Sequence, residues 1–435
     1  MEQNLLAHPF RQLDEMQMEG HIVPEGVFGD DFYKFLMGRF IYHKYRDVDV
    51  SFGFTNRTKG VQLGEHISEN DFQREFEHFR KTARLDNTGK YYLLGIQYGE
   101  DKSMFDKGYM GFLQNELEIP PVEYGKTDDG DITLVSRGKW NNVSHVEIPV
   151  LRIVNGLYIR SLLKKMSRSE RYAVYAEGTR RLAEKIKFLK ESGFNATISE
   201  FGNRRSAGPA WHAFVTHTLL EELPGIFPGP SKTNLAMETA STPMGTNAHE
   251  QWMVLAALSF DGTRESLEKM TLQFLTDWWE MYGYDLSIVL PDTFGSKFVF
   301  DTMTDKMIRD YKGARQDSGR VMDFAEMYRQ RIILAGADSR EKLLIPSDGL
   351  TVADAIEYWK ILRETFRLSF GIGTHLTNDL GLQTLSIVMK TIFANGNPTV
   401  KLPDNLAKGT GPMSEQIRYK RALGYAVTYF DQPVV

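Results

Sequence analysis

The spacing of apolar residues changes near residue 170, where an irregular pattern gives way to helix-like and strand-like segments in alternation. From Tyr172 to Ser192, the side chains of Leu182, Ile186 and Leu189 fall on one helical face, and a glycine follows. The next segment, NATISEFG, has the composition of a strand. The pattern therefore predicts a helix followed closely by a strand.

Three more units of this kind follow along the chain. A helix is predicted over residues 263–282, before the apolar run LSIVLPD, and another in VMDFAEMYRQRIILAGA, before KLLIPSD. Thr351 and Asp354 form a capping-box pattern at the start of a further helix, which precedes RLSFGIG. Helices alternating with strands that have few polar residues predict an α/β fold with a parallel sheet.

The first 150 residues lack this alternation. They contain a helix-like segment, DDFYKFLMGRFIYHKY, and alternating strand-like segments at 48–54 and 131–135. We therefore predict an N-terminal α/β domain over residues 1–150 and a barrel domain over 151–405. Residues 406–435 are expected to form a C-terminal segment that packs on the N-terminal domain.

The position of the unusual polar residues favours a barrel over an open doubly wound sheet. Six clusters each follow a strand-like run, namely EFGNRR, PMGTNAHE, LPDTFG, ARQDSG, IPSDG and FGIGTHLTND. In a barrel of parallel strands all carboxyl ends lie on one face, so these clusters are expected to converge on one pocket.

Composition narrows the possible chemistry. The chain has 435 residues, a formal net charge of -5 and no cysteine, which excludes disulfides, thiolate nucleophiles and cysteine-based metal sites. It has no long basic tract or membrane-length apolar run, so neither a nucleic-acid nor a membrane partner is expected, and we predict a cytoplasmic protein. The histidines lack the spacing of a dedicated metal site, so no direct metal ligand is predicted.

The clusters have the residue types of an anion-binding site, although each also has a purely structural explanation. Glycine-rich turns such as SDG and GIGTH can bind phosphate through backbone N–H groups or simply allow tight turns. Arg315 and Asp317 point to one face of an extended segment and could bind phosphate and a ribose hydroxyl or magnesium, or pair with each other. Asp292 follows a very apolar run, where a carboxylate needs a partner, a functional role or a position as a helix cap. His249 stands alone, and a lone histidine is more often a structural residue than a catalytic one.

Taken together and in order, DDFYKFLM, EFGNRR, MGTNAHE, PDTFG, RQDSG, PSDG and FGIGTHLTND resemble the motif series of nicotinate phosphoribosyltransferases. The resemblance runs from about residue 30 to 405. It implies an irregular α/β barrel of the type II phosphoribosyltransferase kind with an N-terminal α/β domain. It further implies a head-to-tail homodimer with shared active sites.

The resemblance also implies roles for individual residues. His249 matches the histidine that accepts phosphate from ATP, and Asp292 and Asp317 match positions that bind ribose and magnesium pyrophosphate. Nicotinate is expected to stack between Phe201 and the Tyr33 of a neighbouring subunit. The remaining expected ligands bind carboxylate or phosphate groups: Arg204, Arg315, Ser347, Gly349, Gly373 and Thr374.

The expected reaction joins nicotinate to phosphoribosyl pyrophosphate, giving nicotinate mononucleotide and pyrophosphate, while ATP is converted to ADP and phosphate. It would be the first step of NAD salvage from nicotinate, with Mg²⁺ accompanying pyrophosphate and ATP. The chain departs from the family pattern in the segment GPSKTNLAMETAST before Met244 and at Arg320, where an aspartate is common.

Three other functions are alternatives to this one. Nicotinamide phosphoribosyltransferases share the barrel but are longer and usually place an acid near the amide, while quinolinate phosphoribosyltransferases have a more basic pocket and no phosphohistidine. A catalytically silent sensor of phosphosugars is the third. The motifs GTNAHE and RQDSG favour the nicotinate enzymes, and the presence of His249, Asp292 and Asp317 argues against a silent member.

Overall fold

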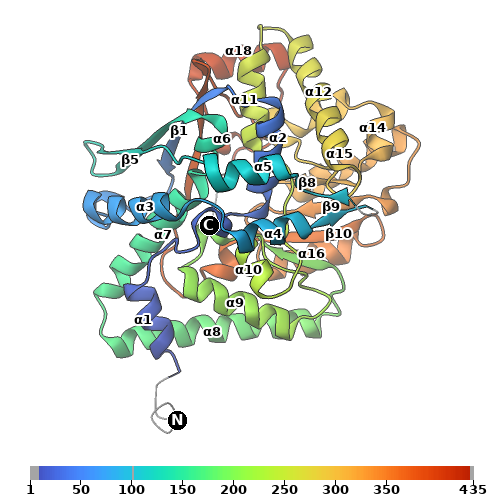
Figure 1. Ribbon diagram of the computed structural model, residues 1–435. Helices are drawn as coiled ribbons and strands as arrows, with labels where there is room; N and C mark the ends of the chain where they lie inside the picture. Colours follow the sequence, from blue (N-terminus) through green and yellow to red (C-terminus); the bar gives the residue numbers. More distant parts are fainter. Residues whose placement is uncertain (1–8, 100–101, 432–435) are drawn as a thin grey trace.

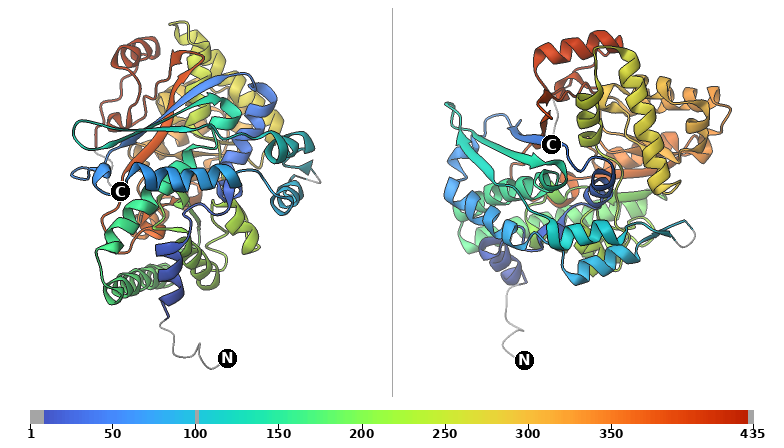
Figure 2. Two further views of the ribbon diagram at one scale, coloured as in Figure 1. Left: turned by 60° about the vertical axis from the view of Figure 1, so that its left-hand side comes forward. Right: turned by 45° about the horizontal axis from the view of Figure 1, so that its top comes forward.

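The computed structural model describes residues 9–99 and 102–431, which are organised around two five-stranded sheets (Figures 1 and 2). One sheet is parallel and the other is antiparallel. A two-stranded hairpin, β2 (Gln97–Tyr98) and β3 (Lys102–Ser103), accompanies them.

The parallel sheet has the strand order β6-β10-β9-β8-β7, and every neighbouring pair is parallel. Its strands are almost entirely buried, as expected for a parallel sheet covered by helices. The strands are β6 (Thr197–Glu200), β7 (Ile288–Val289), β8 (Gly313–Gln316), β9 (Leu343–Pro346) and β10 (Arg367–Ile372).

Short extended segments, in place of regular strands, complete the circle between β6 and β7. Ser231 N–H donates to the carbonyl of Glu200, and Met244 N–H donates to that of Pro230. On the other side, the Asn247 side-chain amide donates to the carbonyl of Ile288 in β7 at 2.9 Å. The prediction of an irregular α/β barrel is therefore confirmed.

Helices cover the barrel, and several begin and end where the sequence predicts. Thr263 caps α12 by accepting a hydrogen bond from the Ser266 N–H, and the helix ends before Gly283, whose φ is 61°. The Thr351–Asp354 capping box is present at the start of α16. The helices are α8 (Arg168–Glu191), α9 (Pro209–Glu222), α10 (Thr233–Glu238), α11 (His249–Ser259), α12 (Arg264–Tyr282), α13 (Ser296–Thr302), α14 (Asp305–Asp310), α15 (Val321–Leu334), α16 (Val352–Leu362) and α17 (Thr374–Thr377).

The antiparallel sheet combines the two ends of the chain. Its order is β12-β11-β1-β5-β4, so a late strand pairs directly with the earliest one, from Val50 opposite Ala394 to Asn56 opposite Ile387. Two strands within the range expected for the barrel therefore belong to the sheet of the N-terminal domain. The strands are β1 (Asp49–Asn56), β4 (Val122–Lys126), β5 (Ile132–Lys139), β11 (Ile387–Ala394) and β12 (Asn397–Pro398).

Helices α1–α7 belong to the N-terminal part of the chain. They are α1 (Arg11–Glu19), α2 (Phe32–Lys44), α3 (Glu69–Thr82), α4 (Asn87–Gly95), α5 (Lys107–Gly111), α6 (Trp140–Val143) and α7 (Glu147–Lys164). Helices α6 and α7 contact the antiparallel sheet, whereas α1 packs against α8 and α9 of the barrel. Short 3-10 or π turns lie between the larger elements, at Gly26–Gly29, Leu63–Glu65, Phe112–Glu116, Asn203–Arg205, Asp292–Phe294, Ser339–Glu341 and Leu406–Lys408.

The C-terminal helix α18 (Met413–Leu423) contacts the barrel helices, whereas we expected this segment to pack on the N-terminal domain. The Tyr419 ring lies 3.9 Å from that of Phe260 and 5.7 Å from that of Phe294. Arg264, the first residue of α12, donates a hydrogen bond to the Leu423 carbonyl. Figure 1 shows α18 beside α11 at the top of the molecule.

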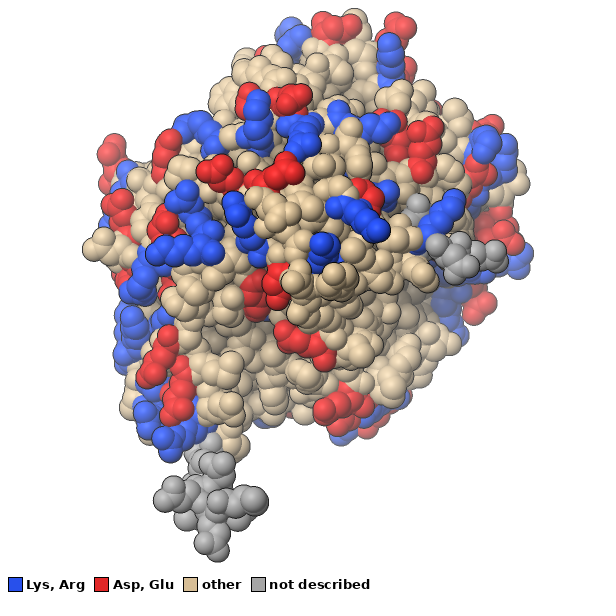
Figure 3. Space-filling model, in the orientation of Figure 1, with Lys and Arg blue, Asp and Glu red and all other residues tan. Residues whose placement is uncertain are grey.

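Among the described residues, no helix is both long and apolar enough to cross a membrane. On the face shown in Figure 3, lysine and arginine side chains lie among aspartates and glutamates, without a large area of a single sign.

An aromatic cluster joins the N-terminal part to the barrel, and its loss is expected to destabilise the whole chain. Phe274 of α12 is 1% exposed, and its ring lies 5.5 Å from Phe40 of α2 and 4.8 Å from Trp252 of α11. Phe274→Ala should lower the free energy of unfolding by about 3–5 kcal/mol because it leaves a cavity. Urea denaturation measures this, with Phe188→Ala as the control, since Phe188 is 46% exposed.

Candidate active site

The polar clusters converge at the carboxyl ends of the parallel strands, on a cavity of about 170 Å³. Five of the six clusters contribute to its wall. The expected residues that line it are Tyr33, Phe201, Arg204, His249, Arg315, Asp317 and Gly349.

The sixth cluster, FGIGTHLTND, lies behind the wall instead. Among the described residues that line the cavity, none comes from this cluster. A Cβ on Gly371 would lie 2.4 Å from the Phe201 ring, so the glycine allows that ring to pack against β10. Gly373 and Thr374 were expected to bind phosphate, and neither lines the cavity; the Thr374 hydroxyl is buried without a hydrogen-bond partner among the described residues.

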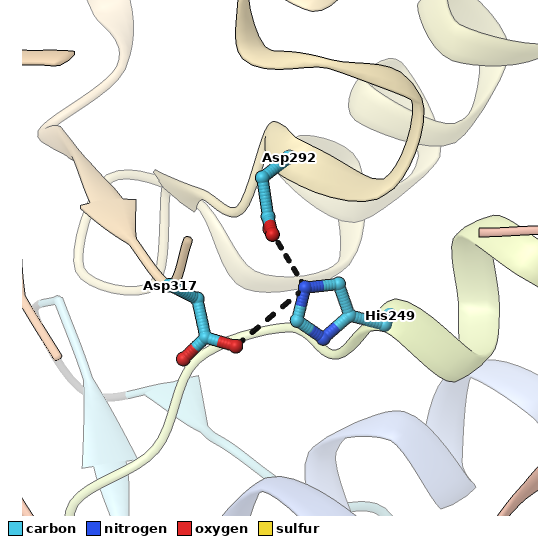
Figure 4. Close-up of side chains that lie close together, drawn as sticks. All are labelled: His249, Asp292 and Asp317. Carbon is cyan, nitrogen blue, oxygen red and sulfur yellow. Dashed lines mark hydrogen bonds and ion pairs between the residues drawn. The ribbon is translucent and has the colours of Figure 1, made fainter. Parts of the chain in front are cut away.

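His249 and two carboxylates lie together at the mouth of the barrel (Figure 4). The Nε2 atom of His249 lies 2.7 Å from Asp292 Oδ1 and 3.7 Å from Asp317 Oδ2. The other ring nitrogen, Nδ1, points away from both carboxylates in Figure 4. His249 begins helix α11, whereas Asp292 follows β7 and Asp317 follows β8.

Asp292 is 0% exposed, and its carboxylate has three partners. Besides His249, it accepts a hydrogen bond from the Ser318 hydroxyl at 2.7 Å and lies 3.3 Å from Lys401 Nζ. Burial by itself raises the pKa of Asp292, but the neighbouring His249 and Lys401 outweigh it and hold the pKa well below the usual value. Asp292 is therefore an ionised, fully satisfied carboxylate and not the helix cap that the sequence also allowed.

His249 is neutral in this environment. Burial lowers its pKa to about 4, although the Asp292 charge acts in the opposite direction. In a neutral imidazole one nitrogen carries the proton and the other a lone pair. Because ionised Asp292 must receive a proton, we infer that Nε2 carries it, which leaves the lone pair on Nδ1.

Arg315 and Asp317 point to the same side of the chain, as predicted, and they bind each other. The guanidinium donates to Asp317 Oδ1 at 2.7 Å and to the hydroxyl oxygens of Ser347 and Thr246. It also lies over the Phe201 ring, with Cζ 5.3 Å from the ring centroid. The arginine thus presents a positive group on the face of an aromatic ring, beside a carboxylate that remains 22% exposed.

A buried charge network supports the opposite wall of the cavity. Lys34 is 0% exposed, and its Nζ lies 2.7 Å from both Glu147 Oε2 and Glu250 Oε2. Glu147 in turn accepts a hydrogen bond from the Tyr33 hydroxyl and pairs with Arg204 at 3.3 Å. Tyr33 therefore lines the cavity of its own chain, whereas the resemblance implied that it enters the site of a partner.

Three donor atoms could together hold a metal ion, since the ligand atoms of His249, Asp292 and Asp317 all lie within 4.8 Å of one another. Magnesium, however, prefers oxygen ligands and regular octahedral geometry. Here one donor is a histidine nitrogen, and the ammonium group of Lys401 lies 3.0 Å from it. The cluster therefore does not suit a resident magnesium ion.

Several residues of the cavity wall were not identified from the sequence. Most of them come from segments without a recognisable local motif. They are Arg57, Glu147, Arg205, Asp348, Lys390, Lys401 and Lys408. A signal was present only for Arg205 and Asp348, which lie within the predicted clusters EFGNRR and IPSDG.

The two departures from the family pattern lie where the barrel meets other parts of the chain. Lys232 forms an ion pair with Glu25, and the Ser231 hydroxyl donates to Asp31 at 2.6 Å, so the atypical segment binds the N-terminal part. The Arg320 guanidinium lies 5.2 Å from the centroid of the Tyr429 ring, in the C-terminal segment.

Fold and site together define a type II phosphoribosyltransferase, with an irregular barrel, an N-terminal α/β part and a cationic cavity at the carboxyl ends of the strands. The chain belongs to the nicotinate phosphoribosyltransferase family, because residues 196–430 match the sequence model of that family and residues 28–155 match its N-terminal domain.

Solved structures are similar over almost the whole chain. The nicotinate phosphoribosyltransferase of Vibrio cholerae is 25% identical, with a TM-score of 0.83 over 95% of this chain and 96% of that one. That of Porphyromonas gingivalis is also 25% identical, with a TM-score of 0.80 over 92% and 100%. A structure from Saccharomyces cerevisiae, 21% identical, has a TM-score of 0.81 over 94% and 100%, which shows the shared fold.

The lowered pKa of His249 leads to a prediction about pH. Because the folded pKa of about 4 lies below the unfolded value of about 6.5, the unfolded chain takes up this proton first. The contribution of His249 to the free energy of unfolding is therefore complete above pH 6.5 and declines as the pH falls toward 4.

The protonation state of the ring can be measured directly. In ¹⁵N NMR spectra, the His249 ring, assigned by comparison with His249→Gln, should remain neutral at pH 5.5. A ring already half protonated at pH 6.5 would contradict this assignment.

Proposed function

We propose that the chain joins nicotinate to phosphoribosyl pyrophosphate, forming nicotinate mononucleotide and pyrophosphate, and that ATP drives the reaction through phosphorylation of His249. The observation that carries this proposal is the hydrogen bond from neutral His249 to ionised Asp292 at the mouth of a barrel of this family.

The glycosyl transfer needs little covalent participation by the protein. The pyridine nitrogen attacks C1 of the ribose as the bond from C1 to pyrophosphate breaks, and positive charge develops on the sugar. Asp317, ionised and partly exposed in the cavity, can accept hydrogen bonds from ribose hydroxyls and oppose this charge. Magnesium would enter with the pyrophosphate group that it neutralises, and not as a resident ion.

The carboxylate of nicotinate would bind the positive groups on the cavity wall. Arg315 lies on the Phe201 face, and Arg204 lies beside Tyr33, so a flat anionic ring finds aromatic surface and a guanidinium together. Glu147 is paired with both Lys34 and Arg204, and these charges lower its pKa against the effect of burial. It is therefore a positioning residue for Tyr33 and Arg204, not a free acid that would select an amide.

The phosphorylation step follows from the arrangement of the His249 ring. The Nδ1 lone pair attacks the γ-phosphorus of ATP, an Nδ1–P bond forms, and the bond to the departing ADP oxygen breaks. The ring then gains positive charge, which Asp292 stabilises through Nε2–H. Attack of water on phosphorus later releases inorganic phosphate and restores the neutral ring. The added phosphoryl charge would order the cationic cavity for the sugar substrate.

The main test separates synthesis from its coupling to ATP. Purified protein is incubated with nicotinate, phosphoribosyl pyrophosphate and Mg²⁺, with and without ATP, and mononucleotide is followed by chromatography. His249→Ala should lose the stimulation by ATP and retain basal synthesis. His217→Ala, an exposed histidine on α9, is the control and should behave as the wild type. Absence of product from nicotinate under every condition would refute the proposed activity.

The role of Asp292 gives a second test. Asp292→Asn keeps the size of the side chain but removes the charge that orients and stabilises the His249 ring. Phosphohistidine formation from γ-labelled ATP should slow about 100-fold or more, the usual cost of losing one such electrostatic contact. Trapping the acid-labile, base-stable phosphoprotein measures the rate. An unchanged rate would show that Asp292 acts elsewhere.

The homodimer with shared active sites stays a prediction from the resemblance. Tyr33 lines the cavity of its own chain, so mixing Tyr33→Ala and His249→Ala chains tests whether it also serves the site of a partner. Restored ATP-stimulated synthesis in mixed dimers would show shared sites, and no restoration would show that each site is formed by one chain.

A further inference from the structure

A groove with a volume of about 670 Å³ adjoins the barrel-mouth cavity. It lies between strands β1 and β11 on one side and residues 407–416 on the other, and we call it the sheet groove. Four residues line both the cavity and the sheet groove: Arg57, Val388, Lys390 and Thr391. The two spaces therefore lie next to each other, and the groove is within the size range of small-molecule sites, roughly 300–1,000 Å³.

The junction between cavity and groove carries two cations without a counter-ion. Neither the Arg57 guanidinium nor the Lys390 ammonium forms a hydrogen bond or ion pair with any described residue, whereas Lys401 and Lys408 are paired with Asp292 and Asp348. Burial and the nearby charges of Lys401 and Arg57 hold the pKa of Lys390 well below its usual value. An anion bound at the junction would relieve this repulsion.

The part of the sheet groove that does not border the cavity has an accessible apolar wall. Ile392 and Phe393 are 36% and 42% exposed, and Pro412 completes this wall. Exposed apolar side chains next to unpaired cations fit a ligand with a flat apolar body and a highly charged end. Phosphoribosyl pyrophosphate has no apolar body, and nicotinate is small and must lie beside the ribose in the cavity.

We propose that the sheet groove binds the adenosine part of ATP, with the triphosphate passing Arg57 and Lys390 toward His249. The inference rests on the proposed ATP coupling and adds the place where the nucleotide enters. The charges of Asp292 and Asp317 act on Lys390, so the junction lies within electrostatic range of the His249 cluster. Phosphoribosyl pyrophosphate would occupy the cavity without using the far part of the groove.

Filling the sheet groove tests the proposal in the full-length protein. Thr55 lies in the groove wall at an exposed position of β1, where a strand tolerates an aromatic side chain, so Thr55→Trp should obstruct the adenosine position. Isothermal titration calorimetry with the unreactive analogue β,γ-imido-ATP should show a Kd raised about tenfold, a loss of roughly 1.4 kcal/mol. The matched control is Thr133→Trp, at an exposed position of β5 in the same sheet and outside the groove wall, and it should leave the Kd unchanged.

A second variant distinguishes loss of the binding surface from misfolding caused by the added tryptophan. Phe393→Ala removes an exposed ring without adding bulk, and it should weaken analogue binding in the same direction. The Kd for phosphoribosyl pyrophosphate, titrated without nucleotide, should be the same in all variants.

Each other outcome overturns the proposal. An unchanged Kd for the analogue in Thr55→Trp would place the nucleotide elsewhere. An equal loss of phosphoribosyl pyrophosphate binding would show that the variant disturbs the cavity itself, and no binding of the analogue by the wild type would refute nucleotide binding to the groove. A change in oligomeric state with unchanged nucleotide affinity would identify the groove as a contact between copies of the chain. Because the analogue does not react, its binding is measured independently of His249 phosphorylation, so failure of the proposed coupling remains distinguishable.

Discussion

The charge of Asp292, fully enclosed by protein, is the constraint on which the organisation of the barrel mouth depends. A buried carboxylate is costly unless its charge and its lone pairs are satisfied. Here the partners come from separate parts of the chain: His249 from the start of α11, Ser318 from the turn after β8, and Lys401 from the segment after β12. Ser318 also accepts a hydrogen bond from the Asp404 N–H, which brings the chain after Lys401 into the same network. One carboxylate thus fixes the relative positions of the segments that form the cavity.

The buried ammonium group of Lys34 likewise connects separate segments of the chain, at another wall of the cavity. Lys34 connects Glu147, at the start of α7, to Glu250, which also accepts a hydrogen bond from the Trp140 indole at 2.7 Å. Since Glu250 follows His249 directly, the two networks are linked through one peptide unit at the beginning of α11. The wall that contains Tyr33 and the cluster around His249 are therefore held by two sets of charge pairs that are joined through the backbone. Such sets are rigid, because moving one member exposes another charge without a partner.

The parts of the structure set by local sequence were predictable. Helix periodicity, the caps at Thr263 and Thr351, and the position of polar clusters after apolar strands gave the barrel and most of its cavity wall. What could not be predicted depends on long-range pairing. Lys401 lies next to His249 only because β11 returns to the antiparallel sheet, and no local pattern marks that return. Helix α7 is buried on nearly all sides and so lacks the apolar stripe by which a surface helix is recognised.

The pairing of β1 with β11 has a consequence for how the chain acquires its structure during synthesis. Asp49 and Asn395, which are hydrogen-bonded at the end of this pair, are 346 residues apart. β1 is the central strand of its sheet, so one of its edges has no partner until nearly the whole polypeptide has left the ribosome. The entire barrel is made in the meantime, and contacts of such long range form slowly. An open strand edge is a template for association with other chains, so the period before β11 emerges is the one in which the nascent protein most needs protection from aggregation.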